Sequence, residues 1–349
     1  MDLFTPITEH GKLHPNFLNA LEVDRQGERN VVQSWAEGFP DRDNKFVHEF
    51  QTTFNSSFWE LYLHGLLRSY DFELDWAHAS PDFNVRAHQS EFIVEAVTAN
   101  AASGARPEWD KPVFDVNDLP LKEFWPLNHV AMVRLSNALS GKVRKYGQSY
   151  SRLRHVAGKP FVIAVAPFEQ PLFQHQYDRP IRALLYNDYV DEDAFIASPE
   201  SFPSGHPPSV ALNSIEKSNG ATIDLGIFLD EGWAEVSAVL YSCAATWGKT
   251  VAMSSSFREG VIATLRMGEN GPERHVARVG EPSEVVSDGL QIYHNPFAFH
   301  PLPLDVFRRD GVVQHYFSED GWHREGEIGS LLYRMPISIG VAPKSASTP

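Results

Sequence analysis

Three carboxylates stand inside segments of the chain that are otherwise apolar. Glu60 lies within Phe-Trp-Glu-Leu-Tyr-Leu, Asp82 within Pro-Asp-Phe-Asn-Val, and Glu95 within Phe-Ile-Val-Glu-Ala. Burying an ionised carboxylate costs free energy unless a cation or hydrogen bonds compensate its charge. If the three acids converge, their oxygens form a site suited to a hard divalent cation such as Mg²⁺ or Mn²⁺.

The expected strands can bring two of these acids side by side. Pro81 favours the start of a strand, so Asp82 is expected at the mouth of one strand, and Glu95 near the end of the next. In a hairpin these two ends approach each other, and two like charges at short range repel unless a cation lies between them. Glu60 could reach the same point from the preceding helix.

A divalent cation at such a point would lower the pKa of a bound water and stabilise charge on a phosphoryl oxygen. That is the chemistry of phosphodiester hydrolysis. Each acid taken alone has a simpler interpretation, because acids at strand ends and on helices usually face water or pair with a nearby lysine or arginine. The apolar flanks of all three favour the shared site.

The apolar pattern predicts the elements that must position these acids. Helices are expected over 45–70 and 127–146. Strands are expected, in chain order, over 71–76, 82–86, 92–98, 161–166 and 234–241. A helix between strands favours an α/β fold in which helices cover the faces of a mixed sheet. Residues 170–232, rich in proline and polar turns, are expected to leave the core.

Three regions are expected along the chain. Residues 1–45 are interpreted as an N-terminal helical extension, and 46–245 as the α/β core with insertions. Residues 246–349 are interpreted as C-terminal decoration packed on that core. The length of 349 residues is compatible with one core that carries insertions.

With its segments in this order, the chain resembles the PD-(D/E)XK nuclease superfamily, the restriction-endonuclease-like proteins. The resemblance covers about residues 50–170 and is carried by the segments 58–63, 81–85, 92–96, 141–147 and 160–165. It implies an αβββαβ core and a metal ion, Mg²⁺ or Mn²⁺, held by Asp82, Glu95 and Glu60 with the backbone carbonyl of Ala96. It also implies cleavage of DNA or, as a second choice, RNA, and is compatible with a homodimer.

The chain departs from the family pattern at one position. The family places a lysine two residues after the second acid, where this chain has Val97, and valine can neither orient water nor stabilise negative charge. Some members carry the lysine on the following helix, where Lys142 shares the apolar face and Lys145 points about 80° away. We expect Lys142 to substitute for the motif lysine, with Lys145 as second choice. In the simpler interpretation both lysines extend to water.

Composition limits the function classes. With 42% hydrophobic residues, wholesale disorder is excluded. The net charge of −15 argues against broad attraction to nucleic acid or a membrane, although a local basic cluster at Arg144, Arg152 and Arg154 could contact phosphate. Cys243 is the one cysteine, so no intrachain disulfide or cysteine-rich zinc site can form. The N-terminal residues and the lack of a long apolar run predict a cytoplasmic protein that does not enter a membrane.

The leading hypothesis from the sequence is a metal-dependent nuclease in which Glu60, Asp82 and Glu95 hold Mg²⁺ and Lys142 assists the attacking water. The alternative is a catalytically inactive protein of the same fold that binds nucleic acid or another protein. Val97 favours the loss of hydrolysis, and the net charge of −15 favours a protein partner over nucleic acid. An α/β enzyme of another kind that uses the same acids ranks third, because no cofactor motif supports it.

Overall fold

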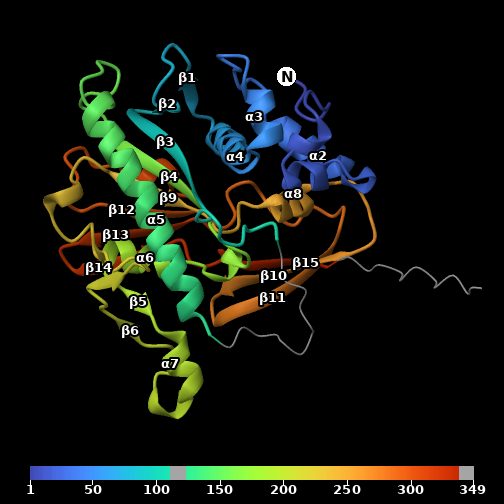
Figure 1. Ribbon diagram of the computed structural model, residues 1–349. Coiled ribbons are helices and arrows are strands. Elements are labelled where there is room, and N and C mark those ends of the chain that lie inside the picture. The colour runs from blue at the N-terminus through green and yellow to red at the C-terminus, as the bar shows by residue number, and fades with distance from the viewer. Residues whose placement is uncertain (111–122, 338–349) are drawn as a thin grey trace, which may run out of the picture.

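A computed structural model describes residues 1–110 and 123–337. These residues form an α/β protein with a mixed eight-stranded sheet flanked by helices, together with small antiparallel sheets (Figure 1). The helical elements include α1 (Pro15–Ala20), α2 (Gln26–Trp35), α3 (Phe46–Thr52), α4 (Asn55–Ser69), α5 (Trp125–Lys145), α6 (Arg179–Tyr186), α7 (Glu192–Ala197) and α8 (Trp247–Met253).

The strands of the large sheet come from both halves of the chain. In spatial order they are β1 (Glu73–Asp75), β2 (Phe83–Ala87), β3 (Ser90–Asn100), β4 (Phe161–Phe168), β9 (Ala238–Tyr241), β12 (Gln291–His294), β13 (Val313–Ser318) and β14 (Gly321–Glu325). Strands β1, β2 and β3 form an antiparallel meander, and β3, β4 and β9 run parallel. Strand β12 is antiparallel to β9 and parallel to β13, which pairs antiparallel with β14.

Three smaller sheets complete the described strands. The largest joins β10 (Val261–Gly268), β11 (Gly271–Arg278) and β15 (Leu331–Ile337), with β10 in the centre. Two short hairpin-like pairs join β5 (Tyr189–Val190) to β6 (Ser209–Val210), and β7 (Ser214–Glu216) to β8 (Thr222–Asp224). Among the described residues, no helix is long and apolar enough to span a membrane.

Helices cover both faces of the large sheet. Helix α5 packs against β3, β4 and α6 on one face, and α4 packs against β3 on the other. Figure 1 shows the long α5 lying across the front of these strands. Helices α2 and α3 pack on α4, and α2 also contacts α8, which lies against β15. The N-terminal helices therefore connect the large sheet to the three-stranded sheet.

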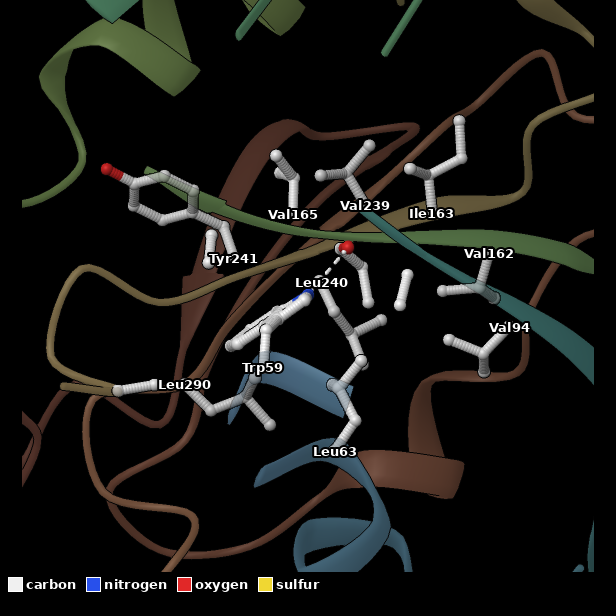
Figure 2. Close-up of a cluster of buried hydrophobic side chains, with 14 of the residues drawn as sticks. Trp59, Leu63, Val94, Val162, Ile163, Val165, Val239, Leu240, Tyr241 and Leu290 are labelled. Carbon is white, nitrogen blue, oxygen red and sulfur yellow. Dashed lines mark hydrogen bonds between the residues drawn. The ribbon is translucent and has the colours of Figure 1, made fainter. Parts of the chain in front are cut away.

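The core is densest where α4 meets the parallel strands. Every residue of β4 is buried, as expected for a central strand covered on both faces. Figure 2 shows Trp59 and Leu63 of α4 beside Val94 and Leu240, while alternate residues such as Val165 point to the other face. The Trp59 indole N–H donates a hydrogen bond to the Ala164 carbonyl, 3.0 Å away. This bond ties the middle of α4 to the centre of the sheet.

The predicted helix over 45–70 is two helices. Helix α3 ends at Thr52 and α4 begins at Asn55. The hydroxyls of Thr52 and Thr53 bond back to carbonyls of the preceding turn, and β-branched residues are weak helix formers. The Asn-Ser-Ser sequence that follows favours a helix start, because such side chains compete with the backbone inside helices. Apolar periodicity continues across the break and conceals it.

Two other expectations need correction. The segment 170–232 contains α6, which is buried and packs on α5, so it does not simply leave the core. Pro180 stands at the first turn of that helix, a position where proline is well tolerated, so a proline there was no sign of a turn-rich region. The C-terminal region contributes β12, β13 and β14 to the large sheet as well as packing on it.

We predict that Trp59→Phe lowers the free energy of unfolding by about 2 kcal/mol, because the change removes a buried hydrogen bond and leaves a small cavity. Urea denaturation would measure the difference. The matched control is Trp125→Phe, since Trp125 is 39% exposed, and its change should stay within about 0.5 kcal/mol. Equal effects of the two substitutions would contradict the role of Trp59 in anchoring α4.

Candidate active site

Asp82 stands at the entrance of β2, next to the strand that carries Glu95. Phe83 of β2 pairs with Val94 of β3, so Asp82 lies one residue beyond that pair and opposite Glu95. The Ala96 backbone N–H donates a 2.7 Å hydrogen bond to Asp82 Oδ2. The side chain of Asp82 thus continues the β2–β3 pairing where the backbone of β2 ends.

Glu95 is fully buried in the middle of β3 and faces α5. Its Oε1 accepts hydrogen bonds from the ammonium groups of Lys142 and Lys145, each at 2.8 Å, and from the Tyr150 hydroxyl at 3.2 Å. Its Oε2 is buried and has no hydrogen-bond partner among the described residues. One carboxylate oxygen therefore carries all the polar contacts, and the other keeps its lone pairs available.

The two lysines come from the last turn of α5. Lys142 is the more enclosed, with 20% of its side chain exposed, whereas Lys145 is 47% exposed and also lies 4.9 Å from the centre of the Tyr150 ring. Burial acts to lower the pKa of Lys145, but its hydrogen bonds with Glu95 and Tyr150 outweigh burial and raise that pKa. Both lysines that the sequence offers as substitutes for the motif lysine therefore contact the same acid.

Tyr150 is a site residue that the sequence reading missed. Helix α5 continues into a π-helical turn, Tyr146–Tyr150, in which the Ser151 N–H bonds to the Tyr146 carbonyl. A π-helical turn holds more residues than an α-helical turn, so the angle between successive side chains is smaller. Tyr150 lies beyond the end of α5 at Lys145 and still faces Glu95. Turns of this kind are rare in proteins, and those that occur are often found at functional sites. Burial raises the pKa of Tyr150 to about 12, so the phenol remains a proton donor near neutral pH.

Glu60 joins this group through its charge. It lies on α4 and is only partly exposed, and its side chain makes no hydrogen bond with another described residue. Its pKa is raised to about 8, chiefly by burial and also by the negative charges of Asp82 and Glu95, against the opposing charge of Lys142. The pKa of Asp82 is likewise raised to about 6, first by burial and then by Glu95.

These interactions bear on whether the site suits a metal ion. Within residues 1–110 and 123–337, no set of three His, Cys, Asp or Glu side chains is grouped so as to hold a metal directly. The donor set near β3 nevertheless has the chemistry that Mg²⁺ prefers, because Glu95 Oε2 is buried without a partner and Asp82 supplies a second carboxylate. The N–H and C=O groups of one strand residue point to the same side, so the Ala96 carbonyl faces the side of Asp82.

The basic cluster of the sequence reading lies beside this site. Arg144 belongs to the last turn of α5, and Arg152 and Arg154 follow the π-helical turn. All three are exposed, and none makes an ion pair or hydrogen bond with another described residue. An exposed group of uncompensated guanidinium groups near the lysines of the site can attract phosphate.

Comparison of this chain with protein-family models, with curated proteins and with solved structures found no match.

The raised pKa of Glu60 predicts how stability depends on pH. The folded state retains the Glu60 proton more strongly than the unfolded state, whose pKa is near the ordinary value of 4.5. The resulting stabilisation is complete below that value, is lost as pH rises to about 8, and changes no further above it. Relative to the wild type, Glu60→Gln should therefore gain stability over this interval and then level off.

Urea denaturation with EDTA, at several pH values from about 5 to about 9, would measure this difference. Glu259→Gln is the control, because Glu259 is exposed and makes no contact recorded among the described residues. A difference between Glu60→Gln and wild type that does not vary with pH would contradict the raised pKa.

Proposed function

We propose that this protein is a metal-dependent nuclease that hydrolyses phosphodiester bonds, with DNA as the expected substrate. The observation that carries the proposal is the contact of Lys142 and Lys145 with Glu95, beside Asp82 and within the electrostatic range of Glu60. Two strand acids next to a lysine from the following helix are what the resemblance to the PD-(D/E)XK nucleases calls for once Val97 has replaced the motif lysine.

The order of elements supports the same proposal. Helix α4, the meander β1–β2–β3, helix α5 and strand β4 follow one another in the chain, and the four strands are neighbours in the sheet. This order agrees with the αβββαβ core expected for a restriction-endonuclease-like fold. The helices α4 and α5 lie on opposite faces of that sheet, so side chains from both can approach its rim.

Charge balance supports a cation at this site. Glu60, Asp82 and Glu95 carry three negative charges when ionised, and Lys142 and Lys145 supply two positive charges. With all three acids ionised, one negative charge is left without a matching lysine. Burial is the main cause of the raised pKa values of Glu60 and Asp82, and repulsion between the acids adds to it. A divalent cation would remove this deficit.

In the proposed mechanism Asp82, Glu95, Glu60 and the Ala96 carbonyl would hold Mg²⁺ or Mn²⁺. When bound, such an ion lowers the pKa of water and stabilises charge that develops on phosphoryl oxygens. Lys142 would donate a hydrogen bond to the attacking water or to a non-bridging phosphate oxygen and so stabilise negative charge. Tyr150 and Lys145 would hold Glu95 in place through its Oε1. The exposed arginines after α5 would bind the phosphates that flank the scissile bond.

A second function is favoured by the same contacts. Two lysines on one carboxylate oxygen already compensate the charge of Glu95 without a metal. A protein of this fold that has lost hydrolysis, and that binds nucleic acid or another protein, would keep such a charge-compensated centre. Metal binding separates the two functions.

We predict that Asp82→Asn and Glu95→Gln each reduce Mg²⁺-dependent cleavage of plasmid and linear DNA by at least about a hundredfold, because each removes a charged oxygen donor. Calorimetry with Mn²⁺ should find a site in the wild type that Asp82→Asn removes. Glu91→Gln is the matched control, since Glu91 is an exposed acid on the same strand and should not affect cleavage. A wild type that binds no Mn²⁺ and cleaves no DNA or RNA would support the non-catalytic function instead.

We further predict that Lys142→Met lowers cleavage by about a hundredfold but leaves Mn²⁺ binding intact, because the ammonium stabilises charge and is not a metal ligand. Lys145→Met should have a smaller effect, since Lys145 is more exposed and Tyr150 also donates a hydrogen bond to the same oxygen of Glu95. Cleavage rates and calorimetry on the same preparations would measure both effects. Unchanged cleavage by Lys142→Met would remove it from the catalytic residues, and a larger loss in Lys145→Met would reverse the two roles.

A further inference from the structure

A cavity of about 310 Å³ lies where the N-terminal helices meet the three-stranded sheet. Its walls come from α1, the start of α4, α8 and β15, and from the residues that follow β4 and β9. Figure 1 shows α2, α4 and α8 close together beside the sheet that contains β15. The volume is at the lower end of the range for pockets that hold small organic ligands.

The position of the cavity is typical of ligand sites in α/β proteins. Phe168 is the last residue of β4, and Cys243 and Ala244 follow closely after β9. The cavity therefore opens beyond the carboxyl ends of two adjacent parallel strands. Ligands in open α/β sheets bind preferentially outside those ends.

Helix α4 separates the cavity from the acids of the candidate active site. Trp59 points into the sheet, and its neighbours in the sequence flank it on the helix by about 100° on either side. Phe58 lines the cavity on one flank, whereas Glu60 on the other senses the charges of Asp82 and Glu95. The cavity is thus a separate site, and its interpretation does not depend on the proposed nuclease activity.

One part of the wall is aromatic. The ring of Trp247 lies 6.1 Å from that of Phe54 and 6.3 Å from that of Phe58, measured between ring centres. Trp109 adds a fourth ring, is 37% exposed, and is held by an edge contact with His14 at 4.4 Å. Aromatic faces of this kind accept a flat ring of a ligand, and stacking on them is tolerant of ring type.

A second part of the wall is a fixed hydrogen-bond acceptor. Glu108 is buried, and its Oε1 accepts hydrogen bonds from the side-chain amides of Asn16 at 2.7 Å and Asn55 at 2.9 Å. No lysine or arginine among the described residues forms an ion pair with Glu108, and burial raises the pKa of this acid, so its oxygens remain available to N–H donors of a ligand. A carboxylate held by two amides suits the amino group of a heterocyclic base.

A third part of the wall is basic. Arg25 lines the cavity. Its Nε contacts Glu22 and Asp24 and its Nη1 contacts Glu28, whereas its Nη2 makes no hydrogen bond with the described residues. Arg334 also lines the cavity, but its nitrogens are engaged by Glu284, Thr246 and the Ala244 carbonyl. The Nη2 of Arg25 is therefore available to bind an anionic group of a ligand.

We propose that this cavity binds a nucleoside monophosphate, with its base against the aromatic part of the wall and Glu108, and with its phosphate at Arg25. A flat ring, amino donors and an anionic group are the three features that the wall complements. One such molecule, not a polymer, matches the volume of the cavity.

Calorimetric titration of the full chain in EDTA tests this proposal without any contribution from a metal. The probes are the monophosphates of adenosine, guanosine, cytidine and uridine, the four nucleosides, and inorganic phosphate. At least one monophosphate should bind one to one, and its nucleoside should bind about tenfold or more weakly, because a charge-assisted hydrogen bond is lost. No binding of any monophosphate, or equal binding of nucleotide and nucleoside, would overturn the proposal.

Substitutions locate the binding. Arg25→Gln should weaken the monophosphate about tenfold without changing the nucleoside, and Glu28 would still be paired with Arg258. Trp109→Ala should weaken both ligands about tenfold through loss of stacking. Trp125→Ala is its matched control, because Trp125 is 39% exposed and lies outside the cavity.

Asp82→Asn distinguishes this cavity from the candidate active site. It should leave nucleotide binding in EDTA unchanged, so failure of the nuclease proposal would not affect the result. Loss of binding in Asp82→Asn, or normal binding in both Arg25→Gln and Trp109→Ala, would place the ligand elsewhere and overturn the assignment. Thermal unfolding of each variant would verify that it folds, and the exposed position of Trp109 makes Trp109→Ala the variant least dependent on that check.

Discussion

The carboxylate of Glu95 lies on an interior strand of the large sheet and is fully buried. Strand β3 is paired with β2 on one side and β4 on the other, and Glu95 has no exposed surface. A buried carboxylate in this position is strongly unfavourable unless cations and hydrogen bonds compensate it. Lys142, Lys145 and Tyr150 supply that compensation, and all three belong to α5 and its π-helical end. The contacts that compensate the charge of Glu95 therefore also hold the end of α5 against the sheet.

The hydrogen bonds that compensate the charge of Glu95 are distributed unevenly over its two oxygens. Within the part of the chain that the structure describes, one carboxylate oxygen receives three donors and the other receives none. Asp82 is held nearby through the Ala96 N–H, and Glu60 approaches from the opposite helix layer. A core that needed only to be stable would be expected to satisfy both oxygens or to replace the acid with an apolar residue. A buried and partly satisfied acid is more typical of a functional site.

Helix α4 divides the two regions to which we assign ligands. The hydrogen bond from Trp59 to the Ala164 carbonyl fixes the rotation of this helix on the sheet. That rotation turns Glu60 toward the acids and Phe58 toward the cavity on the other flank. The protein has a net charge of −15, but both regions contain positive charge. Exposed arginines follow α5, and other arginines line the cavity. Net charge describes the whole surface and not the places where a phosphate would bind.

The sequence by itself determined much of the local structure. Apolar periodicity and turn residues, which are local properties, predict the buried strands over 92–98 and 161–166 and the helix over 127–146. They also predict Asp82 at the entrance of one strand and Glu95 on the next. The same periodicity predicted one helix over 45–70, where the structure has α3 and α4. The apolar pattern of the two helices continues across the break between them.

Only the tertiary structure decided which groups meet. Lys145 and Tyr150 reach Glu95 because the end of α5 lies over β3, about fifty residues away in the chain, and because a π-helical turn rotates Tyr150 toward the acid. The cavity near Trp247 depends in the same way on segments from both ends of the chain. A pattern of residues records which face of an element is apolar, but contacts between distant segments depend on how those faces pack together.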